Sequence, residues 1–202
     1  MYADSHTGPV SSIFQELERE TVEETGHPNM LTGKVVGTLL KILVQASGAR
    51  KVVEIGTFTG YSALMMASGL PEGGELITCE VSREYARTAR RYFDRSPHGK
   101  KIEIRLGAAL DTVREIPDES VDLVFIDADK GSYQDYYDES LRIVKKGGLI
   151  TVDNVLWYGT VLSPRDDDSR AIASFNASVF RDDRVEKVLL TVRDGIYLLR
   201  KR

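Results

Sequence analysis

Three side chains with oxygen ligands stand where two apolar runs end, and together they could bind a metal ion. The run 121–127 ends at Asp127, and the run 148–153 ends at Asp153, which Asn154 follows. Neighbouring strands lie about 4.8 Å apart, so side chains at two adjacent strand ends can converge on one ion. Carboxylate and amide oxygens suit Mg²⁺, Ca²⁺ or Mn²⁺, whereas Zn²⁺ favours His and Cys. Any one of these residues alone would be read as a cap of a strand or helix. The three together predict a divalent-cation site.

A lysine close to this cluster could transfer a proton. Asp129 and Lys130 come two and three residues after Asp127. A nearby cation and partial desolvation both favour the neutral form of a lysine, which can then accept a proton. We expect Lys130 to act in this way, and the alternative is a surface lysine held in a salt bridge.

A glycine turn after the first expected strand could bind a nucleoside. Gly56 and Gly60 let the backbone approach a ligand closely, and the helix that follows presents free N–H groups. Glu80 ends the second expected strand, where a carboxylate can accept both hydroxyls of an adenosine ribose. The turn lacks the Gly-x-Gly-x-x-Gly spacing that binds a pyrophosphate. Together with the hairpin signal Asp194-Gly195, this pattern favours S-adenosylmethionine over NAD.

The elements that would position these residues alternate between strands and helices. The expected strands cover 51–55, 75–80, 102–106, 121–127, 148–153, 185–192 and 196–200. The expected helices cover 10–24, 33–47, 61–69, 83–95, 109–116, 132–144 and 170–180. Repeated strand–helix units predict a parallel sheet with helices on both faces, and Asp194-Gly195 predicts that the last two strands pair antiparallel. The expected fold is therefore α/β and Rossmann-like, with a mostly parallel seven-stranded sheet closed by a C-terminal hairpin.

The composition is that of an ordinary globular protein. The chain has 202 residues, of which 42% are hydrophobic and 29% are charged, and its formal net charge is −4. This length is enough for one sizeable core, so we expect a single domain over 1–202. An acidic balance argues against a broad phosphate-binding surface. We therefore expect a small-molecule partner rather than nucleic acid.

Several segments are expected to carry no chemistry of their own. The five arginines of 83–95 alternate with acids and tyrosines, which indicates a solvated helix face, and the acidic run 166–168 is expected to be a solvated loop. The lone cysteine, Cys79, is expected to be buried in a strand. No stretch approaches about 18 apolar residues, and the N-terminus lacks the features of a signal peptide. We therefore expect no membrane span and a cytoplasmic location.

The stretch 30–200 resembles the cation-dependent O-methyltransferases, a family that includes caffeoyl-CoA and catechol O-methyltransferases. The segments that carry the similarity are 54–62, 125–130, 153–157 and 194–196. The resemblance implies a class I, S-adenosylmethionine-dependent methyltransferase. It also implies a small catechol-type phenolic acceptor and a homodimer, with the helices of 1–47 covering the cofactor and acceptor sites.

The resemblance also implies roles for particular residues. Those implied to contact S-adenosylmethionine are Thr32, Glu54, Gly56, Thr57, Phe58, Ser62, Glu80, Ala109, Asp127 and Asp129. Those implied to bind the cation, with Mg²⁺ as the first choice, are Asp127, Asp153 and Asn154. The implied catalytic residues are Lys130, as general base, and Asp127, while Trp157 and Tyr158 are implied to line the acceptor pocket.

Two other functions fit parts of the sequence. Some bacterial relatives methylate a hydroxylated uridine in tRNA, although the acidic net charge disfavours that substrate. The third hypothesis is an NAD-binding module or a non-catalytic cofactor binder, which the missing glycine spacing disfavours.

Overall fold

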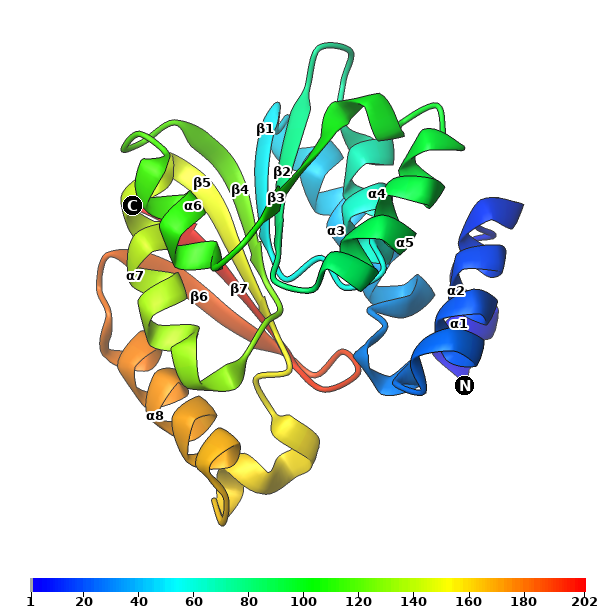
Figure 1. Ribbon diagram of the computed structural model, residues 1–202. Helices are drawn as coiled ribbons and strands as arrows, with labels where there is room; N and C mark the ends of the chain where they lie inside the picture. Colours follow the sequence, from blue (N-terminus) through cyan, green and yellow to red (C-terminus); the bar gives the residue numbers. More distant parts are fainter. Residues whose placement is uncertain (1) are drawn as a thin grey trace. The chain divides into compact units, whose positions relative to one another are not determined.

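Seven strands pair in the computed structural model, which describes residues 2–202 (Figure 1). The strands are β1 (Lys51–Ile55), β2 (Glu75–Glu80), β3 (Ile102–Leu106), β4 (Val121–Ile126), β5 (Val144–Asp153), β6 (Val185–Leu190) and β7 (Ile196–Lys201). Their order is β3-β2-β1-β4-β5-β7-β6. The pairs β2–β3, β1–β4 and β4–β5 are parallel, whereas β7 is antiparallel to both β5 and β6. The predicted mostly parallel seven-stranded sheet with a C-terminal hairpin is confirmed.

The first of two compact units comprises the residues up to 50 and 57–109. Its helices are α1 (Tyr2–His6), α2 (Ser12–Thr25), η1 (Pro28–Met30), α3 (Gly33–Ser47), α4 (Tyr61–Gly69), α5 (Arg83–Asp94) and η2 (Gly99–Lys101). Strands β2 and β3 run in register from Leu76 opposite Ile102 to Glu80 opposite Leu106, so their carboxyl ends lie at one edge. Helix α4 packs against α3 and β2, and most of its side chains are buried. That burial explains why its sequence is apolar on all sides rather than on one face.

The segment Pro28–Ser47, which comprises η1 and α3, is long and apolar enough to cross a membrane by length and composition alone. The expectation that no stretch approaches such a span is therefore wrong on this criterion. In the structure, Val36, Leu40 and Val44 of α3 are fully buried. A core helix of this kind passes the same test, so the segment is weak evidence for a membrane span.

The arginines of α5 pair with acids of α2. Arg91 forms ion pairs with Glu20 and Glu24, and Arg95 forms one with Glu16. These three acids are spaced four residues apart on α2, so they lie on one side of that helix. The expected solvated face of α5 is therefore also a docking face for α2.

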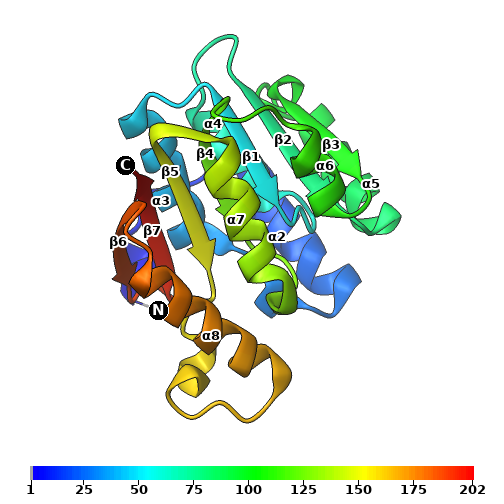
Figure 2. The same ribbon diagram turned by 90° about the vertical axis from the view of Figure 1, so that its left-hand side faces the viewer.

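The second unit comprises 51–56 and 110–202 and so includes nearly all of α6 (Ala109–Glu115). Its other helices are η3 (Lys130–Ser132), α7 (Tyr133–Ile143), η4 (Trp157–Leu162) and α8 (Asp167–Arg181). Helix α7 packs on β4 and β5 and against α8 (Figure 2). Strands β1 and β4 are almost entirely buried, which is why both are mostly apolar in sequence rather than alternating between apolar and polar residues. A single domain over 1–202, with the helices of 1–47 covering the site, stays a prediction.

Two helices differ from the prediction. The sequence predicts no helix before residue 10, but α1 lies there. The loop expected at 166–168 is wrong, because Asp166 is the N-cap of α8. Its carboxylate accepts a hydrogen bond from the N–H of Ser169 at 2.7 Å, and the Ser169 hydroxyl accepts one from the N–H of Asp166 at 3.1 Å. This reciprocal capping stabilises the start of α8, which the run of three acidic residues led us to predict as a loop.

Candidate functional site

The two carboxylates expected to bind a cation lie at neighbouring strand ends of the second unit. In the parallel pair of β4 and β5, Ile126 is opposite Val152, so Asp127 and Asp153 follow at the same edge. The N–H of Asp127 donates to the carbonyl of Ile55 at 2.9 Å, which extends the pairing of β4 with β1 to this point. The predicted adjacency of the two strand ends is therefore confirmed.

Gly56 shows why this edge needs a glycine. Its φ is +102°, and a Cβ atom there would lie well inside van der Waals distance of the backbone carbonyl of Asp127. Any other residue would combine a strained backbone with a clash against a backbone atom that cannot rotate away. Gly56 therefore allows β1 to end directly beside the loop that starts at Asp127.

The ammonium group of Lys130 lies among the oxygens of this edge. Its Nζ donates to the hydroxyl of Tyr133 at 2.6 Å, to Asn154 Oδ1 at 2.9 Å and to Asp127 Oδ1 at 3.3 Å. An ammonium has three donors, so each of its N–H groups has an acceptor. The side chain of Lys130 is only 10% exposed. Lys130 does form the salt bridge of the alternative interpretation, with Asp127. It differs from that alternative because it is buried and not on the surface.

Asp153 is the most deeply buried acid of the cluster. Burial, followed by the negative charge of Asp127, raises the pKa of Asp153 to about 7. Its Oδ1 accepts the N–H of Asn154 at 2.8 Å, and Asn154 adopts a left-handed backbone with φ of 59°. A buried carboxylate whose ionisation is opposed by a neighbouring negative charge lies in a site that favours added positive charge.

Two tyrosines of α7 form hydrogen bonds with residues at this edge, and neither is among the residues predicted from the sequence. The hydroxyl of Tyr133 donates to the carbonyl of Asp153 at 3.0 Å, and that of Tyr136 donates to Asp129 Oδ1 at 2.6 Å. Burial and then the charge of Asp127 raise the pKa of Tyr133 well above its usual value. The spacing signal was present, because Tyr133 lies three residues after Lys130 at the first turn of a helix.

The loop after Asn154 is held by the turn between β6 and β7. The carbonyl of Asp194 accepts the N–H of Leu156 at 2.9 Å, and its carboxylate accepts the N–H of Tyr158 at 2.6 Å. The ring of Trp157 lies 5.4 Å from Nζ of Lys130, whereas Tyr158 is 73% exposed. Of the two residues expected to line an acceptor pocket, only Trp157 therefore lies beside the lysine. The sequence predicts Asp194 only as a hairpin residue and gives no signal of its contact with this loop.

In the first unit, the glycine turn is tied to the end of β2. The carboxylate of Glu80 accepts the N–H of Phe58 at 2.7 Å through one oxygen and the N–H of Ser82 at 2.8 Å through the other. Phe58 has a left-handed φ of 49°, and the N–H of Gly60 closes the turn onto the carbonyl of Thr57 at 2.9 Å. Each carboxylate oxygen keeps a second lone pair, so Glu80 can still accept a ligand hydroxyl.

The other residues expected to contact S-adenosylmethionine are spread along the two units. Thr32 directly precedes α3, Ser62 lies in the first turn of α4, and Ala109 begins α6. Glu54 lies in β1 and is fully buried. Their contacts with a ligand stay predictions.

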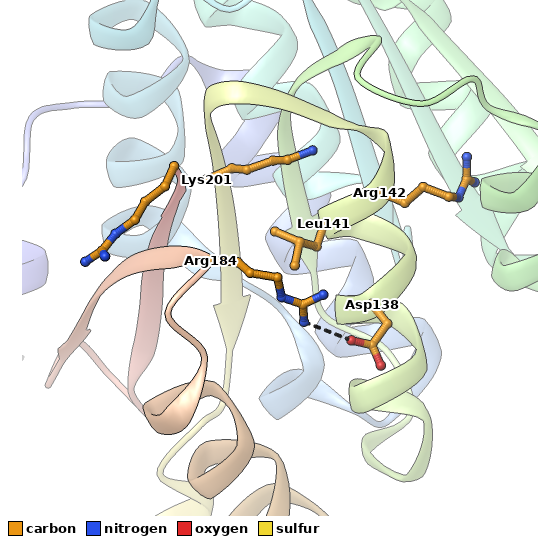
Figure 3. A pocket seen from close by; sticks show the side chains of 6 residues that line it. Asp138, Leu141, Arg142, Arg184 and Lys201 are labelled. Carbon is orange, nitrogen blue, oxygen red and sulfur yellow. Dashed lines mark ion pairs between the residues drawn. The ribbon is translucent and has the colours of Figure 1, made fainter.

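A cavity of about 380 Å³ in the second unit lies away from these strand ends (Figure 3). It is lined by Asp138, Leu141, Arg142, Arg184, Lys201 and Arg202. Lys201 ends β7 near the start of β5, which is the opposite end from Asp153. Arg184 is already paired with Asp182 at 2.6 Å and with Asp138 at 3.8 Å. The cavity is therefore separate from the candidate site.

The donor set of the candidate cation site contains two carboxylates and one amide. Among residues 2–202, no group of three or more His, Cys, Asp or Glu side chains is placed to hold a metal ion. Mg²⁺ commonly takes only one or two protein carboxylates and completes its shell with water or substrate oxygens. Asp127 and Asn154 already direct oxygens at one positive group, Nζ of Lys130. The donor chemistry therefore fits a hard dication.

Known proteins share this fold and resemble the chain in sequence. A model of an O-methyltransferase family matches residues 4–202. Caffeoyl-CoA O-methyltransferase 1 of Zea mays is 37% identical over 203 residues, which are 93% of this chain and 78% of the maize protein. Catechol O-methyltransferase domain-containing protein 1 of Mus musculus is 36% identical over 191 residues, which are 92% of this chain and 72% of the mouse protein. The solved O-methyltransferase of Bacillus cereus in complex with SAH has a TM-score of 0.90 at 31% identity and covers 100% of this chain and 96% of that one.

The fold and these similarities define a Rossmann-like methyltransferase. The chain belongs to the O-methyltransferase family, and its methyl donor is S-adenosylmethionine.

Proposed function

We propose that this enzyme methylates one hydroxyl of a small catechol-type phenolic acceptor with the help of a divalent cation. The residues proposed to hold the cation, which we expect to be Mg²⁺ rather than Ca²⁺ or Mn²⁺, are Asp127, Asp153 and Asn154. The observation that carries the proposal is the convergence of Asp127 and Asn154 on the ammonium of Lys130, beside the buried Asp153. The relatives named caffeoyl-CoA O-methyltransferase 1 and catechol O-methyltransferase domain-containing protein 1 support the acceptor class.

A dication at this position would lower the pKa of a hydroxyl that it contacts and would fix both oxygens of a vicinal diol. A dication at this position would also favour the neutral amine of Lys130 over its ammonium form. The neutral amine is then the group that takes the proton of the reacting hydroxyl, because its Nζ lies at the same strand ends as the proposed ligands. The resulting oxygen forms a bond with the methyl carbon of the sulfonium, the carbon–sulfur bond breaks, and S-adenosylhomocysteine leaves. The sulfonium is already an activated donor, so the protein supplies mainly position and charge.

The residues proposed to contact S-adenosylmethionine belong to both units. In the first unit they are the turn residues Thr57 and Phe58 together with Thr32, Ser62, Glu80 and Ala109. In the second unit they are Glu54, Gly56, Asp127 and Asp129. Two features support these assignments, namely the closed glycine turn fastened to Glu80 and the buried Glu54.

The side chains around Lys130 support a planar aromatic acceptor. Trp157, which is only partly buried, presents its ring 5.4 Å from Nζ of Lys130. An aromatic acceptor whose hydroxyl meets the lysine would therefore have an aromatic wall next to its own ring. Homodimer formation and a cytoplasmic location stay proposals.

The test is methyl transfer from labelled S-adenosylmethionine to a panel of catechols that includes caffeic acid, with Mg²⁺ and with EDTA. We expect transfer to a vicinal diol, no transfer to the matching monophenol, and loss of transfer in EDTA that added Mg²⁺ restores. Transfer that ignores EDTA, or that treats monophenol and diol alike, would contradict the proposal. Transfer to hypomodified tRNA, falling steeply with salt, would instead favour the hydroxylated-uridine alternative.

A further inference from the structure

Tyr133 joins the lysine to the end of β5 through a single hydroxyl. This hydroxyl accepts a hydrogen bond from Nζ of Lys130 at 2.6 Å and donates one to the carbonyl of Asp153 at 3.0 Å. A carbonyl can only accept, so the one proton of the hydroxyl is committed to Asp153 and a lone pair faces the lysine. Tyr133 is 1% exposed, so no bulk water competes for either bond.

The ring that carries this hydroxyl is held on two sides. Tyr133 is the first residue of α7, and Phe175 of α8 packs against its ring edge-on with the centroids 5.6 Å apart. Nζ of Lys130 lies 4.7 Å from the centroid of the same ring. Phe175 is also buried, so the hydroxyl is a fixed point rather than one end of a mobile side chain.

The three acceptors of Lys130 differ in what else they must do. Under the proposed function, the side-chain oxygens of Asp127 and Asn154 also bind a cation, so they are not available only as hydrogen-bond acceptors for Lys130. Tyr133 has no such second task, and its partner on the other side is a backbone carbonyl. It is therefore the acceptor that can keep Lys130 in place while the acceptor hydroxyl is bound.

We infer that Tyr133 is a positioning residue, whose hydroxyl fixes Nζ of Lys130 for proton transfer. This inference rests on the proposed role of Lys130 as general base. Tyr133 itself touches neither donor nor acceptor, so it acts only through the lysine. Loss of its hydroxyl should therefore slow turnover while leaving the binding of donor and acceptor nearly unchanged.

The chain offers a matched control in Tyr137, one turn further along α7. Tyr137 is fully buried, and its ring also packs edge-on against Phe175, with centroids 5.9 Å apart. Its hydroxyl donates to Asp182 at 2.9 Å instead of contacting the lysine. Tyr133→Phe and Tyr137→Phe thus each remove one buried hydroxyl from the same helix and the same aromatic cluster.

The experiment compares kcat, the acceptor KM and the Kd of S-adenosylhomocysteine in wild type and both variants. One lost hydrogen bond to a charged partner predicts that Tyr133→Phe lowers kcat about 10- to 100-fold, with KM and Kd within about threefold of wild type. Tyr137→Phe should keep kcat within about twofold, even if both variants lose similar thermal stability. Equal losses of kcat in the two variants, or an unchanged kcat in Tyr133→Phe, would overturn the inference.

A second measurement does not depend on turnover and so separates this inference from the proposed function. Trp157 is the only tryptophan of the chain and lies 5.4 Å from Nζ of Lys130, so its fluorescence reports the position of the lysine. We expect Tyr133→Phe to change the emission in the absence of any acceptor, and Tyr137→Phe to leave it unchanged. In a Lys130→Met background the change caused by Tyr133→Phe should disappear. An emission change that persists without Lys130, or no change in Tyr133→Phe alone, would overturn the inference even if no catechol were methylated.

Discussion

Replacing Asp153 by asparagine should stabilise the metal-free protein more at pH 8 than at pH 5. The pKa of Asp153 is raised from 3.8 to about 7 by burial and by the charge of Asp127. A carboxyl whose pKa is higher in the folded than in the unfolded state binds more protons when folded. The free energy of unfolding therefore falls as the pH rises from about 4 to about 7. Asparagine has the same shape but no charge, so Asp153→Asn removes this dependence.

The size of the effect follows from the two pKa values. With a folded pKa of about 7 and an unfolded value of 3.8, the acid destabilises the fold by about 2 kcal/mol at pH 5 and by about 4 kcal/mol at pH 8. The difference in unfolding free energy between Asp153→Asn and wild type should therefore widen by about 2 kcal/mol between these two pH values. Differences in hydrogen bonding between aspartate and asparagine change the stability equally at both pH values, so they cancel when the two pH values are compared.

The assay is urea unfolding in EDTA at pH 5 and pH 8, followed by circular dichroism. Asp182→Asn is the control, because hydrogen bonds from Arg184 lower the pKa of Asp182 to about 2. Asp182 is therefore ionised at both pH values in the folded and in the unfolded protein. The difference in unfolding free energy between Asp182→Asn and wild type should be the same at pH 5 and pH 8. A gap for Asp153→Asn that does not change with pH, or that narrows towards pH 8, would refute the reasoning.

Two further substitutions test the local architecture. Gly56→Ala should lower the free energy of unfolding by about 3 kcal/mol, because it combines φ of +102° with a clash against the carbonyl of Asp127, whereas Gly26→Ala, at φ of +65° with nothing within 4 Å, should cost about 1 kcal/mol. Similar losses in the two variants, measured by urea unfolding, would contradict this account of the turn. Asp194→Ala removes the acceptor of the Tyr158 N–H and should raise the KM for the phenolic acceptor about tenfold, with the Kd of S-adenosylhomocysteine unchanged. An unchanged KM would show that the loop does not need this contact.

The strands β1, β2 and β4 could be predicted closely because their sequences are mostly apolar and end at glycine or at an acid. β1 and β2 have the predicted bounds, and β4 ends one residue early. The predicted start of β5 at 148 is wrong, because β5 begins at Val144 and includes Gly147 and Gly148. Because parallel strands end at the same edge, the acids at two strand ends could be placed together from the sequence alone. The bounds of α8 and β6 were predicted less accurately, because α8 begins three residues before and β6 ends two residues before the predicted positions. Asp166 reads as a loop residue until its bond with Ser169 is seen.

Two hydrogen bonds of the candidate site could not be predicted from the sequence, because each joins segments that are far apart in the chain. Tyr133 fits the apolar face of a helix, and nothing in its neighbours predicts that its hydroxyl reaches the carbonyl of Asp153. Asp194 carries the tight-turn signal of a hairpin, but its contact with Tyr158 spans 36 residues. Such hydrogen bonds depend on tertiary packing, which local patterns do not encode.

The most direct test of the central claim is the binding of Mn²⁺, followed by electron paramagnetic resonance of the free ion, in wild type, Asp153→Ala and Asp182→Ala. We predict one bound ion per chain in wild type and in Asp182→Ala, and an affinity at least about 100-fold weaker in Asp153→Ala, because a cation at this edge would lose a buried carboxylate ligand. Equal binding by Asp153→Ala and wild type, or no binding by wild type at millimolar Mn²⁺, would contradict a dication held between the ends of β4 and β5.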